Sequence, residues 1–342
     1  FHMYLPRMCN HCLNPSCVAA CPSGSIYKRE EDGIVLVDQD KCRGWRQCIS
    51  SCPYKKVYYN WESGKAEKCI GCYPRVESGM PTVCSESCVG RIRYNGIMLY
   101  DADRIEEIAS TTSEQDIYEA HRSIFLDPND PQVIEAARRD GVPEDWIDAA
   151  RRSPIWKMAM EWKIAFPMHP EFRTLPMVWY VPPLSPVQSA IDQGALPTEP
   201  DGVIPRADAL RMPLQYLASL FTAGKEQPVF DAIAKMMAMR SYQRSVHVEG
   251  KADMRALDKV GLPEQQAKDM YQLMAIANYD DRFVIPTGHA ELTEDDYYGF
   301  QGQNGFTFGN DSSQGISGNS LFPERRKGTV ESREPAPSAD ER

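Results

Sequence analysis

From Pro205 to Tyr279 the apolar residues recur every three or four positions, the pattern of amphipathic helices. Two segments in this stretch, "PVFDAIAKMMAMR" and "PEQQAKDMYQLMAIANY", each begin with proline, which is favoured in the first turn of a helix. We therefore predict a helical C-terminal region. Its methionines lie at helical spacing, which favours core packing over a soft-metal site. The residues predicted to face this core are Leu210, Leu214, Leu217, Phe221, Met236, Met237, Met239, Met270 and Met274.

The stretch before it, residues 101–175, is also predicted to be helical. Pro131, Pro143 and Pro154 each stand where a first helical turn would begin, and Gly141 is a stop signal. The next segment, Arg173–Pro186, contains too many prolines for regular structure. We predict that it is an extended segment packed on a hydrophobic neighbour, with a peptide-recognition ligand as the alternative.

Residues 1–100 show a different pattern, in which groups of cysteines alternate with short strand-like runs. Two strand pairs are predicted around turns at Gly33 and Gly64, and a third in "RIRYNGIMLYD" after Cys88. A cysteine run followed by a strand pair, repeated, is an internal repeat on the ferredoxin plan.

These patterns predict an α+β protein: a ferredoxin-like iron–sulfur domain of short β-hairpins and cluster-binding loops, then a mainly α-helical region and an irregular tail. The predicted divisions are the iron–sulfur domain (1–100), a helical and extended connection (101–186), a helical C-terminal domain (187–290) and the tail (291–342). The tail is rich in glycine, serine and proline, which is typical of irregular segments.

Composition narrows the functional classes. The chain has 342 residues, 42% of them hydrophobic, and a net charge of −10, which argues against a nucleic-acid partner. No apolar run of about eighteen residues and no signal peptide is visible. Because the sequence starts with Phe1 and not Met, we expect a trimmed or fragmentary chain. A small basic cluster lies among the cysteines, either to offset cluster charge or as a solvated face: Lys41, Arg43, Arg46, Lys55 and Lys56.

All 11 cysteines lie between Cys9 and Cys88. An odd number at CxxC and CxxxC spacings favours metal binding over disulfides. In two-cluster ferredoxins, the last cysteine of each run ligates the other cluster. Applied here, this crossed rule predicts a [4Fe–4S] cluster on one set of four cysteines and leaves three for a second centre. The first set is Cys9, Cys12, Cys17 and Cys52, and the second is Cys21, Cys42 and Cys48.

In the second run, "CRGWRQC", Trp45 stands where a fourth ligand belongs. An indole has an N–H donor and no lone pair for iron. Three thiolates therefore predict a [3Fe–4S] cluster, which raises the reduction potential relative to a four-iron centre.

The third run alone leaves two interpretations open. Its pairs of close cysteines form a four-cysteine site that suits zinc or an iron–sulfur cluster, and the two ferredoxin-type runs before it favour iron. The run consists of Cys69, Cys72, Cys84 and Cys88. His11 is interpreted as a hydrogen-bond donor to sulfur, and the other histidines as structural or exposed. Because no catalytic constellation or nucleotide loop is present, we predict electron transfer without a substrate site.

The segments "CNHCLNPSCVAACP", "CRGWRQCISSCPYKKVYYN", "KCIGC" and "PTVCSESCVGRIRY" resemble the iron–sulfur beta subunits of molybdopterin oxidoreductases of the dimethyl-sulfoxide-reductase type. With "LPMVWYVPPLSP", "MMAMR" and "IANYDDRFVIP", the chain is similar to the beta subunit of respiratory nitrate reductase or of nitrite oxidoreductase, cut short at its N-terminus. The resemblance implies four clusters. Cys69, Cys72 and Cys84 would share a [4Fe–4S] cluster with an upstream cysteine, and Cys88 would belong to a further one.

The resemblance also implies partners. A catalytic alpha subunit would carry the molybdopterin cofactor, and a membrane gamma subunit with haem b would hold the complex at the cytoplasmic face. This chain would relay electrons between them, with Trp179 and Tyr180 either on a docking surface or in the chain's own core. The alternatives are nitrite oxidoreductase or another molybdopterin oxidoreductase and, from a different class, a structural zinc protein that binds a partner.

Overall fold

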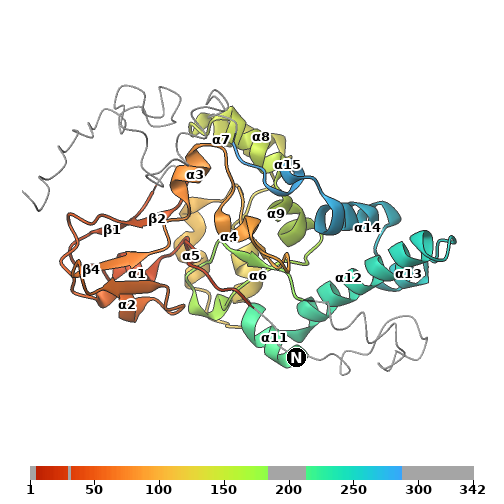
Figure 1. Cartoon of the computed structure of the whole chain (residues 1–342), viewed down its shortest axis with the longest axis horizontal. Helices are drawn as coiled ribbons and strands as arrows, with labels where there is room; N and C mark the ends of the chain where they lie inside the picture. Colours follow the sequence, from red (N-terminus) through yellow and green to blue (C-terminus); the bar gives the residue numbers. More distant parts are fainter. Residues whose placement is uncertain (1–4, 30–31, 184–212, 287–342) are drawn as a thin grey trace, which may run out of the picture.

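The computed structural model describes residues 5–29, 32–183 and 213–286. The cysteine region, red to orange in Figure 1, lies beside a larger helical part, yellow to blue. Small antiparallel sheets are combined with helices, which confirms the predicted α+β class. Leu210 and the tail predicted for residues 291–342 lie outside the described residues. The four-region division stays a prediction.

The first two predicted hairpins are confirmed. Strands β1 (Ile26–Lys28) and β2 (Val35–Val37) pair antiparallel, as do β3 (Val57–Asn60) and β4 (Lys65–Lys68). Gly64 has a φ of 68°, a left-handed conformation that glycine adopts without strain. Short helices accompany the cysteines: α1 (Ser16–Ala19), α2 (Gln47–Ser51), α3 (Tyr73–Glu77) and α4 (Val83–Glu86).

The third predicted hairpin is wrong. Strand β5 (Arg93–Tyr94) pairs with β7 (Trp179–Tyr180), and β7 also pairs with β6 (Phe166–Pro167). The prediction of no regular structure across this proline-rich segment is therefore also wrong at β7. That the segment is extended and packed is confirmed, because Trp179 and Tyr180 are fully buried in the chain's own core.

The same segment binds the first cysteine run through the backbone. The N–H of Leu13 donates to the carbonyl of Leu175 at 2.8 Å, and the N–H of Met177 donates to that of Asn10 at 3.0 Å. The proline-rich segment therefore packs along one side of the first cysteine run.

The predicted helix boundaries in the connecting region are confirmed. Helix α7 (Pro131–Arg139) has Pro131 in its first turn and Asp130 as its cap, whose carboxylate accepts from the N–H of Gln132 at 2.8 Å. Gly141 follows its C-terminus with a φ of 82°. The remaining helices here are α5 (Ile105–Ala109), α6 (Ile117–Arg122), α8 (Glu144–Arg152), α9 (Pro154–Trp156), a π-helical turn (Lys157–Glu161) and two 3₁₀ turns (Ala102–Arg104 and Pro170–Phe172).

The C-terminal helices are also present, and the longest is α12 (Glu226–His247). Met236, Met237, Met239 and Met270 are buried and Met274 packs against them, so the prediction of core methionines is confirmed. Among the described residues, we find no helix both long and apolar enough to cross a membrane. The others are α11 (Leu214–Phe221), α13 (Arg255–Val260), α14 (Glu264–Tyr271), a π-helical turn (Gln272–Ile276) and α15 (Tyr279–Arg282).

Two hydrophobic cores hold the described residues together. The large one joins the connecting and C-terminal helices and contains stacked aromatic rings, such as His121 on Trp179 with centroids 5.6 Å apart. The small one lies between the two hairpins. It consists of Cys12, Cys17, Ile26, Val35, Cys42, Cys48, Cys52, Tyr54, Val57 and Ala66.

Candidate iron–sulfur sites

Thiols from two different runs lie together around Cys12. Burial raises the pKa of Cys12 to about 12, opposed by a hydrogen bond with Thr174 and reinforced by charge repulsion from Cys9, Cys17 and Cys52. Burial likewise raises the pKa of Cys17 to about 11, and repulsion from Cys9 and Cys52 adds to it. Cys52, which follows helix α2, is thus a neighbour of the first run.

A second group forms around Cys48. Burial raises the pKa of Cys48, with further repulsion from Cys21 and Cys42. Cys21 differs from the other two. Burial by itself would raise the pKa of Cys21, but hydrogen bonds from the Ser23 and Ser25 hydroxyls and the backbone lower it to about 6. The second group thus contains one thiol that ionises readily near neutral pH.

The loop that carries Trp45 is fixed by a close backbone contact. Gly44 has a φ of 69°, and a Cβ at this position would lie 2.3 Å from the carbonyl oxygen of Gly64. Only glycine lets the loop approach the β3–β4 turn this closely. Trp45 itself is 58% exposed, between Cys42 and Cys48 in the sequence.

Backbone N–H groups donate to three cysteine sulfurs, two in the second run and one in the third. The N–H of Lys56 donates to Cys52 Sγ at 3.5 Å, and that of Ala66 to Cys42 Sγ at 3.4 Å. The N–H of Gly71 donates to Cys69 Sγ at 3.4 Å. Such donors stabilise the ionised sulfur, which is the form that binds iron.

The third run does not form a single group around Cys69. Burial raises the pKa of Cys69, opposed by the N–H of Gly71 and reinforced by repulsion from Cys9 and, more weakly, Cys84. Cys72 begins helix α3 in the left-handed conformation, with a φ of 51°. Within the third run, Cys69 therefore lies next to Cys9 of the first site.

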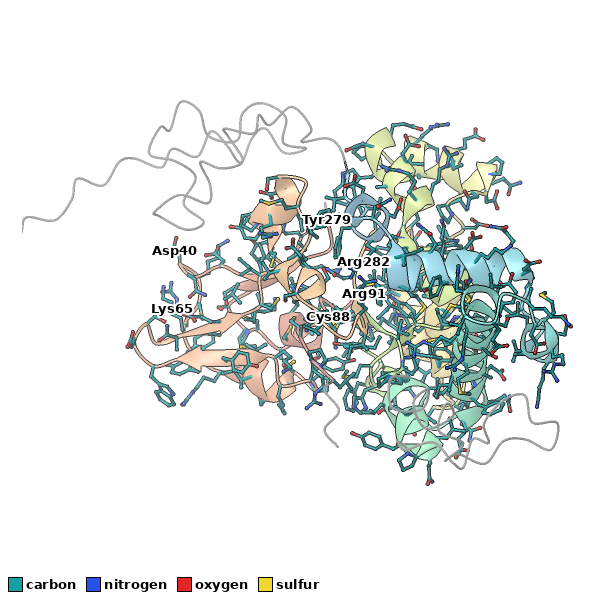
Figure 2. All side chains as sticks on the ribbon, turned by 45° about the vertical axis from the view of Figure 1, so that its right-hand side comes forward. Asp40, Lys65, Cys88, Arg91, Tyr279 and Arg282 are labelled. Carbon is teal, nitrogen blue, oxygen red and sulfur yellow. The ribbon has the colours of Figure 1, made fainter. Side chains whose placement is uncertain are left out.

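Cys88 has different surroundings. It lies with Arg91 and Arg282 where the cysteine region meets the C-terminal helices (Figure 2). Burial lowers the pKa of Arg282, with repulsion from Arg91 adding to it and attraction to Cys88 opposing it. Arg91 donates to the carbonyls of Met274 and Ala275 at 2.8 and 2.7 Å, which anchors the contact.

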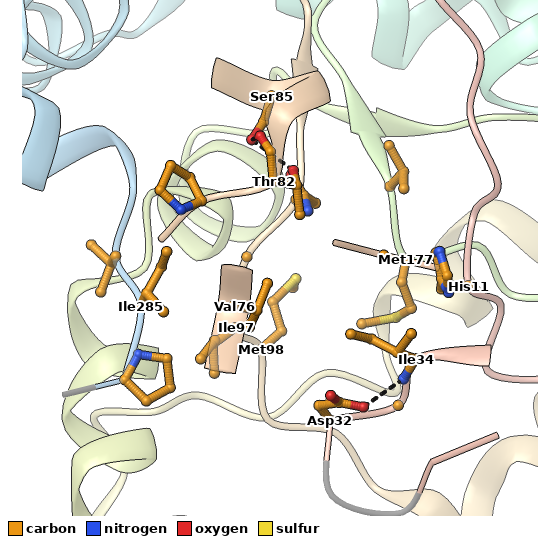
Figure 3. A pocket seen from close by; sticks show the side chains of 18 of the residues that line it. His11, Asp32, Ile34, Val76, Thr82, Ser85, Ile97, Met98, Met177 and Ile285 are labelled. Carbon is orange, nitrogen blue, oxygen red and sulfur yellow. Dashed lines mark hydrogen bonds between the residues drawn. The ribbon is translucent and has the colours of Figure 1, made fainter. Parts of the chain in front are cut away.

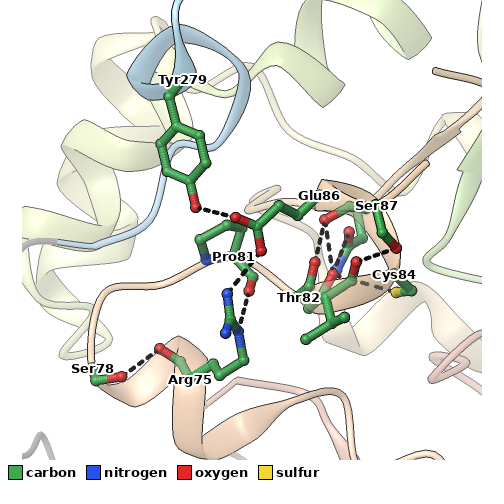
Figure 4. A network of polar contacts seen from close by, with 11 residues as sticks. Arg75, Ser78, Pro81, Thr82, Cys84, Glu86, Ser87 and Tyr279 are labelled. Atoms are coloured by element: carbon green, nitrogen blue, oxygen red, sulfur yellow. Dashed lines mark hydrogen bonds and ion pairs between the residues drawn. The ribbon is translucent and has the colours of Figure 1, made fainter. Parts of the chain in front are cut away.

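A polar network supports the same junction from helix α4 (Figure 4). Glu86 accepts from Arg75 at 2.8 Å and from the hydroxyl of Tyr279 at 3.1 Å. Arg75 also donates to the carbonyl of Pro81 at 3.0 Å. Helix α3, which follows Cys72, and helix α4, which carries Cys84, are thereby tied to α15.

The cations nearest the cysteines are not the predicted ones. Lys28 is held beside Cys12 by hydrogen bonds to the carbonyls of Cys12 and Gly33, and Lys68 donates to the carbonyl of Cys69 at 2.7 Å. Their positions in the strands next to cysteine runs are the signal that would have found them. Of the predicted cluster, four residues are exposed and one is half-buried: Lys41, Arg43, Arg46 and Lys55, and Lys56.

The donor set fits iron–sulfur clusters. All 11 cysteines are free, and grouped thiols that raise one another's pKa are stable as thiolates only when a cation binds them. The amide donors and the half-buried Lys28 and Lys68 supply the hydrogen bonds and positive charge that iron-bound thiolates need. Within the described residues, no three His, Cys, Asp or Glu side chains gather closely enough to hold a single metal ion.

Comparison with known proteins defines the class first. Residues 1–98 match the family described as a 4Fe–4S dicluster domain, so the cysteine region is of the iron–sulfur class. Residues 184–264 match the family described as the C-terminal part of the respiratory nitrate reductase beta chain.

Whole-chain relatives then define the family. The chain is 63% identical to the respiratory nitrate reductase 2 beta chain of Escherichia coli, over 95% of its own length and 63% of that protein's. It is 49% identical to the respiratory nitrate reductase beta chain of Bradyrhizobium sp, over 83% of its own length and 82% of the relative's. The dimethylsulfide dehydrogenase beta subunit of Rhodovulum sulfidophilum is 42% identical over 65% of this chain and 49% of its own length. The chain belongs to the family of respiratory nitrate reductase beta chains.

Proposed function

We propose that this chain is the electron-transfer subunit of a nitrate reductase, without a substrate site of its own. Its membership of the beta-chain family supports this function, together with thiols gathered from separate runs. The chain spans 63% of the length of the Escherichia coli relative, so the role of that whole protein is carried over as part of the proposal. When bound, iron–sulfur clusters accept and release single electrons.

The proposed ligands follow the crossed rule. Cys9, Cys12, Cys17 and Cys52 hold a [4Fe–4S] cluster, which is supported by the mutual repulsion of these thiols. Cys21, Cys42 and Cys48 hold a [3Fe–4S] cluster, supported by the repulsion of Cys48 from the other two.

The third run is proposed to serve two further [4Fe–4S] clusters. Cys69, Cys72 and Cys84 belong to one of them, and Cys88 belongs to the other. The separate surroundings of Cys88, beside Arg91 and Arg282, support this division. In each case the remaining ligands are not among the 11 cysteines of this chain, all of which are assigned above.

The proposed partners are a catalytic alpha subunit with a molybdopterin cofactor and a membrane gamma subunit with haem b. Together they would place this chain at the cytoplasmic face of the membrane, peripherally. Nitrite oxidoreductase is the alternative with the same architecture. The lower identity to dimethylsulfide dehydrogenase, 42% against 63%, favours the nitrate reductase type over more distant relatives.

Trp45→Cys tests the ligand assignment. The new thiol supplies the missing ligand, so the three-iron centre should become a four-iron centre of lower potential. Low-temperature EPR of the assembled complex should show loss of the oxidised [3Fe–4S] signal. Trp61→Cys is the matched control, because Trp61 is also an exposed tryptophan of this region but lies in the β3–β4 turn.

The control should keep the three-iron signal. Persistence of that signal in Trp45→Cys would contradict the assignment. Metal analysis of the wild-type protein tests the other class of function: zinc without iron, and no paramagnetic signal after oxidation or reduction, would identify a structural zinc protein and refute the electron-transfer proposal.

A further inference from the structure

His11 is held in an unusual position between two proposed ligands, Cys9 and Cys12. Its φ is 43°, in the left-handed region that residues other than glycine rarely adopt. Its side chain is buried, with 8% of the residue exposed. The backbone N–H of Val35 donates to His11 Nδ1 at 3.0 Å. Strain of this kind persists where the surrounding structure requires it and is concentrated at functional sites.

That hydrogen bond determines where the imidazole carries its proton. Nδ1 accepts from Val35, so it has no hydrogen of its own, and the proton of the neutral ring is on Nε2. Nε2 is buried and has no hydrogen-bond partner within the described residues. A buried N–H without an acceptor is unfavourable, which indicates that its acceptor is a group that binds here.

The ring lines a pocket of about 340 Å³ between the first and third cysteine runs (Figure 3). Its walls are mainly apolar, as with Ile34, Met98 and Met177. The hydroxyls of Thr82 and Ser85, on the wall next to the third run, are bonded to each other at 2.9 Å.

Lys28 and Asp32, which also line the pocket, are engaged elsewhere, whereas Asn10 Oδ1 and Trp146 Nε1 have no hydrogen-bond partner within the described residues. Lys28 is a donor to the carbonyls of Cys12 and Gly33, and the Asp32 carboxylate accepts from the N–H of Ile34 at 2.9 Å. Cys9 of the first site interacts electrostatically with Cys69 of the third run, so the two sites meet here. Sulfur is the hydrogen-bond acceptor that either site would present to His11.

We propose that His11 donates its Nε2–H to a sulfur atom of one of the two iron–sulfur centres beside it, the one on Cys9, Cys12, Cys17 and Cys52 or the one on Cys69, Cys72 and Cys84. This inference rests on the proposed function. A donor to sulfur stabilises the reduced, more negative cluster, and so His11 raises the potential of that centre. His11 is then a positioning residue for electron transfer and not an iron ligand.

Two substitutions separate this role from a structural one. In His11→Asn the side-chain oxygen lies near the position of Nδ1 and keeps the bond from Val35, and asparagine tolerates positive φ, but the Nε2 donor is lost. In His11→Gln the amide nitrogen reaches the position of Nε2 and keeps the donor, whereas the acceptor for Val35 is lost.

The measurement is a potentiometric titration of the assembled complex, followed by EPR. His11→Asn should shift one neighbouring four-iron centre to lower potential, while His11→Gln stays close to wild type and the three-iron centre is unchanged in both. Unchanged potentials in His11→Asn, an equal shift in both variants, or a shift of every centre alike would overturn the inference. Wild-type protein without clusters would instead refute the proposed function.

Discussion

The two hydrophobic cores of the molecule differ in the types of side chain that form them. The core of the helical part consists of aliphatic, aromatic and methionine side chains that close around one another. Among the described residues, the small core between the hairpins has cysteine at five of its ten positions: Cys12, Cys17, Cys42, Cys48 and Cys52. Apolar burial stabilises the first core by itself, whereas the second depends on what its thiols bind.

Removal of the clusters should give the largest effect and tests this difference directly. Chelation or oxidation leaves mutually repelling thiols in the small core, so the cysteine region should lose its fold while the helical part remains. Hydrogen exchange analysed by mass spectrometry would follow both parts in one sample. Exchange should rise in strands β1–β4 and stay low in α12. Simultaneous loss of protection from hydrogen exchange in both parts would show that they unfold as one cooperative unit.

Replacing one glycine in each part of the molecule with alanine should have an intermediate effect on stability. The loss should be larger in the cysteine region than in the helical part. Gly44→Ala places a Cβ 2.3 Å from the Gly64 carbonyl oxygen, so we expect a loss of about 2–4 kcal/mol and a weaker three-iron EPR signal. Gly141→Ala is the matched control. Gly141 also has positive φ, but a Cβ added there would meet no atom within 4 Å, so the loss should be about 1 kcal/mol.

The free energy of unfolding from denaturant titration, together with the EPR amplitude, distinguishes the two variants. Equal destabilisation by Gly44→Ala and Gly141→Ala, with an unchanged three-iron signal, would show that the close contact at Gly44 does not position the second cysteine run.

Lowering the pH should destabilise the helical core, by less than Gly44→Ala destabilises the cysteine region. Burial lowers the pKa of His121 to about 3, from 6.5 in the unfolded chain. Because the folded state excludes the proton, stability is complete above pH 6.5 and falls as the pH drops towards 3. From pH 7 to pH 5 the loss is about 2 kcal/mol, at about 1.4 kcal/mol per unit of pKa.

His121→Phe should remove that share of the acid sensitivity, because phenylalanine cannot be protonated and can still stack on Trp179. Urea titrations at pH 7 and pH 5 would measure it. The same pH dependence in wild type and variant would show that His121 is not the group responsible.

Local patterns predicted the features that depend on neighbouring residues. Gly64 and the alternation around it predicted the β3–β4 hairpin, and Pro131 with Gly141 predicted the ends of α7. The crossed grouping of Cys52 with the first run follows from ferredoxin spacing and stays a prediction. The structure places Cys52 among the thiols that repel Cys12.

Features formed by distant segments were missed. Strand β5 contains two residues and pairs with β7, which lies more than eighty residues later in the sequence, so a local pattern indicated a hairpin that does not exist. Lys68 directly precedes Cys69 in the sequence, but the hydrogen bond from its ammonium group to the Cys69 carbonyl depends on the fold around that residue and was not predicted. The same holds for Arg282 beside Cys88, which the C-terminal helices bring there.

The backbone bonds between the first cysteine run and the proline-rich segment also impose an order on biosynthesis. Leu13 and Asn14 are paired with Leu175 and Thr174, and β5 with Trp179 and Tyr180. A ribosome has to add about half of the chain after Cys9 before these partners leave the exit tunnel. Iron delivered earlier would meet a first run that lacks this packing, so we expect maturation of the first site to follow the emergence of residues 174–180 from the ribosome.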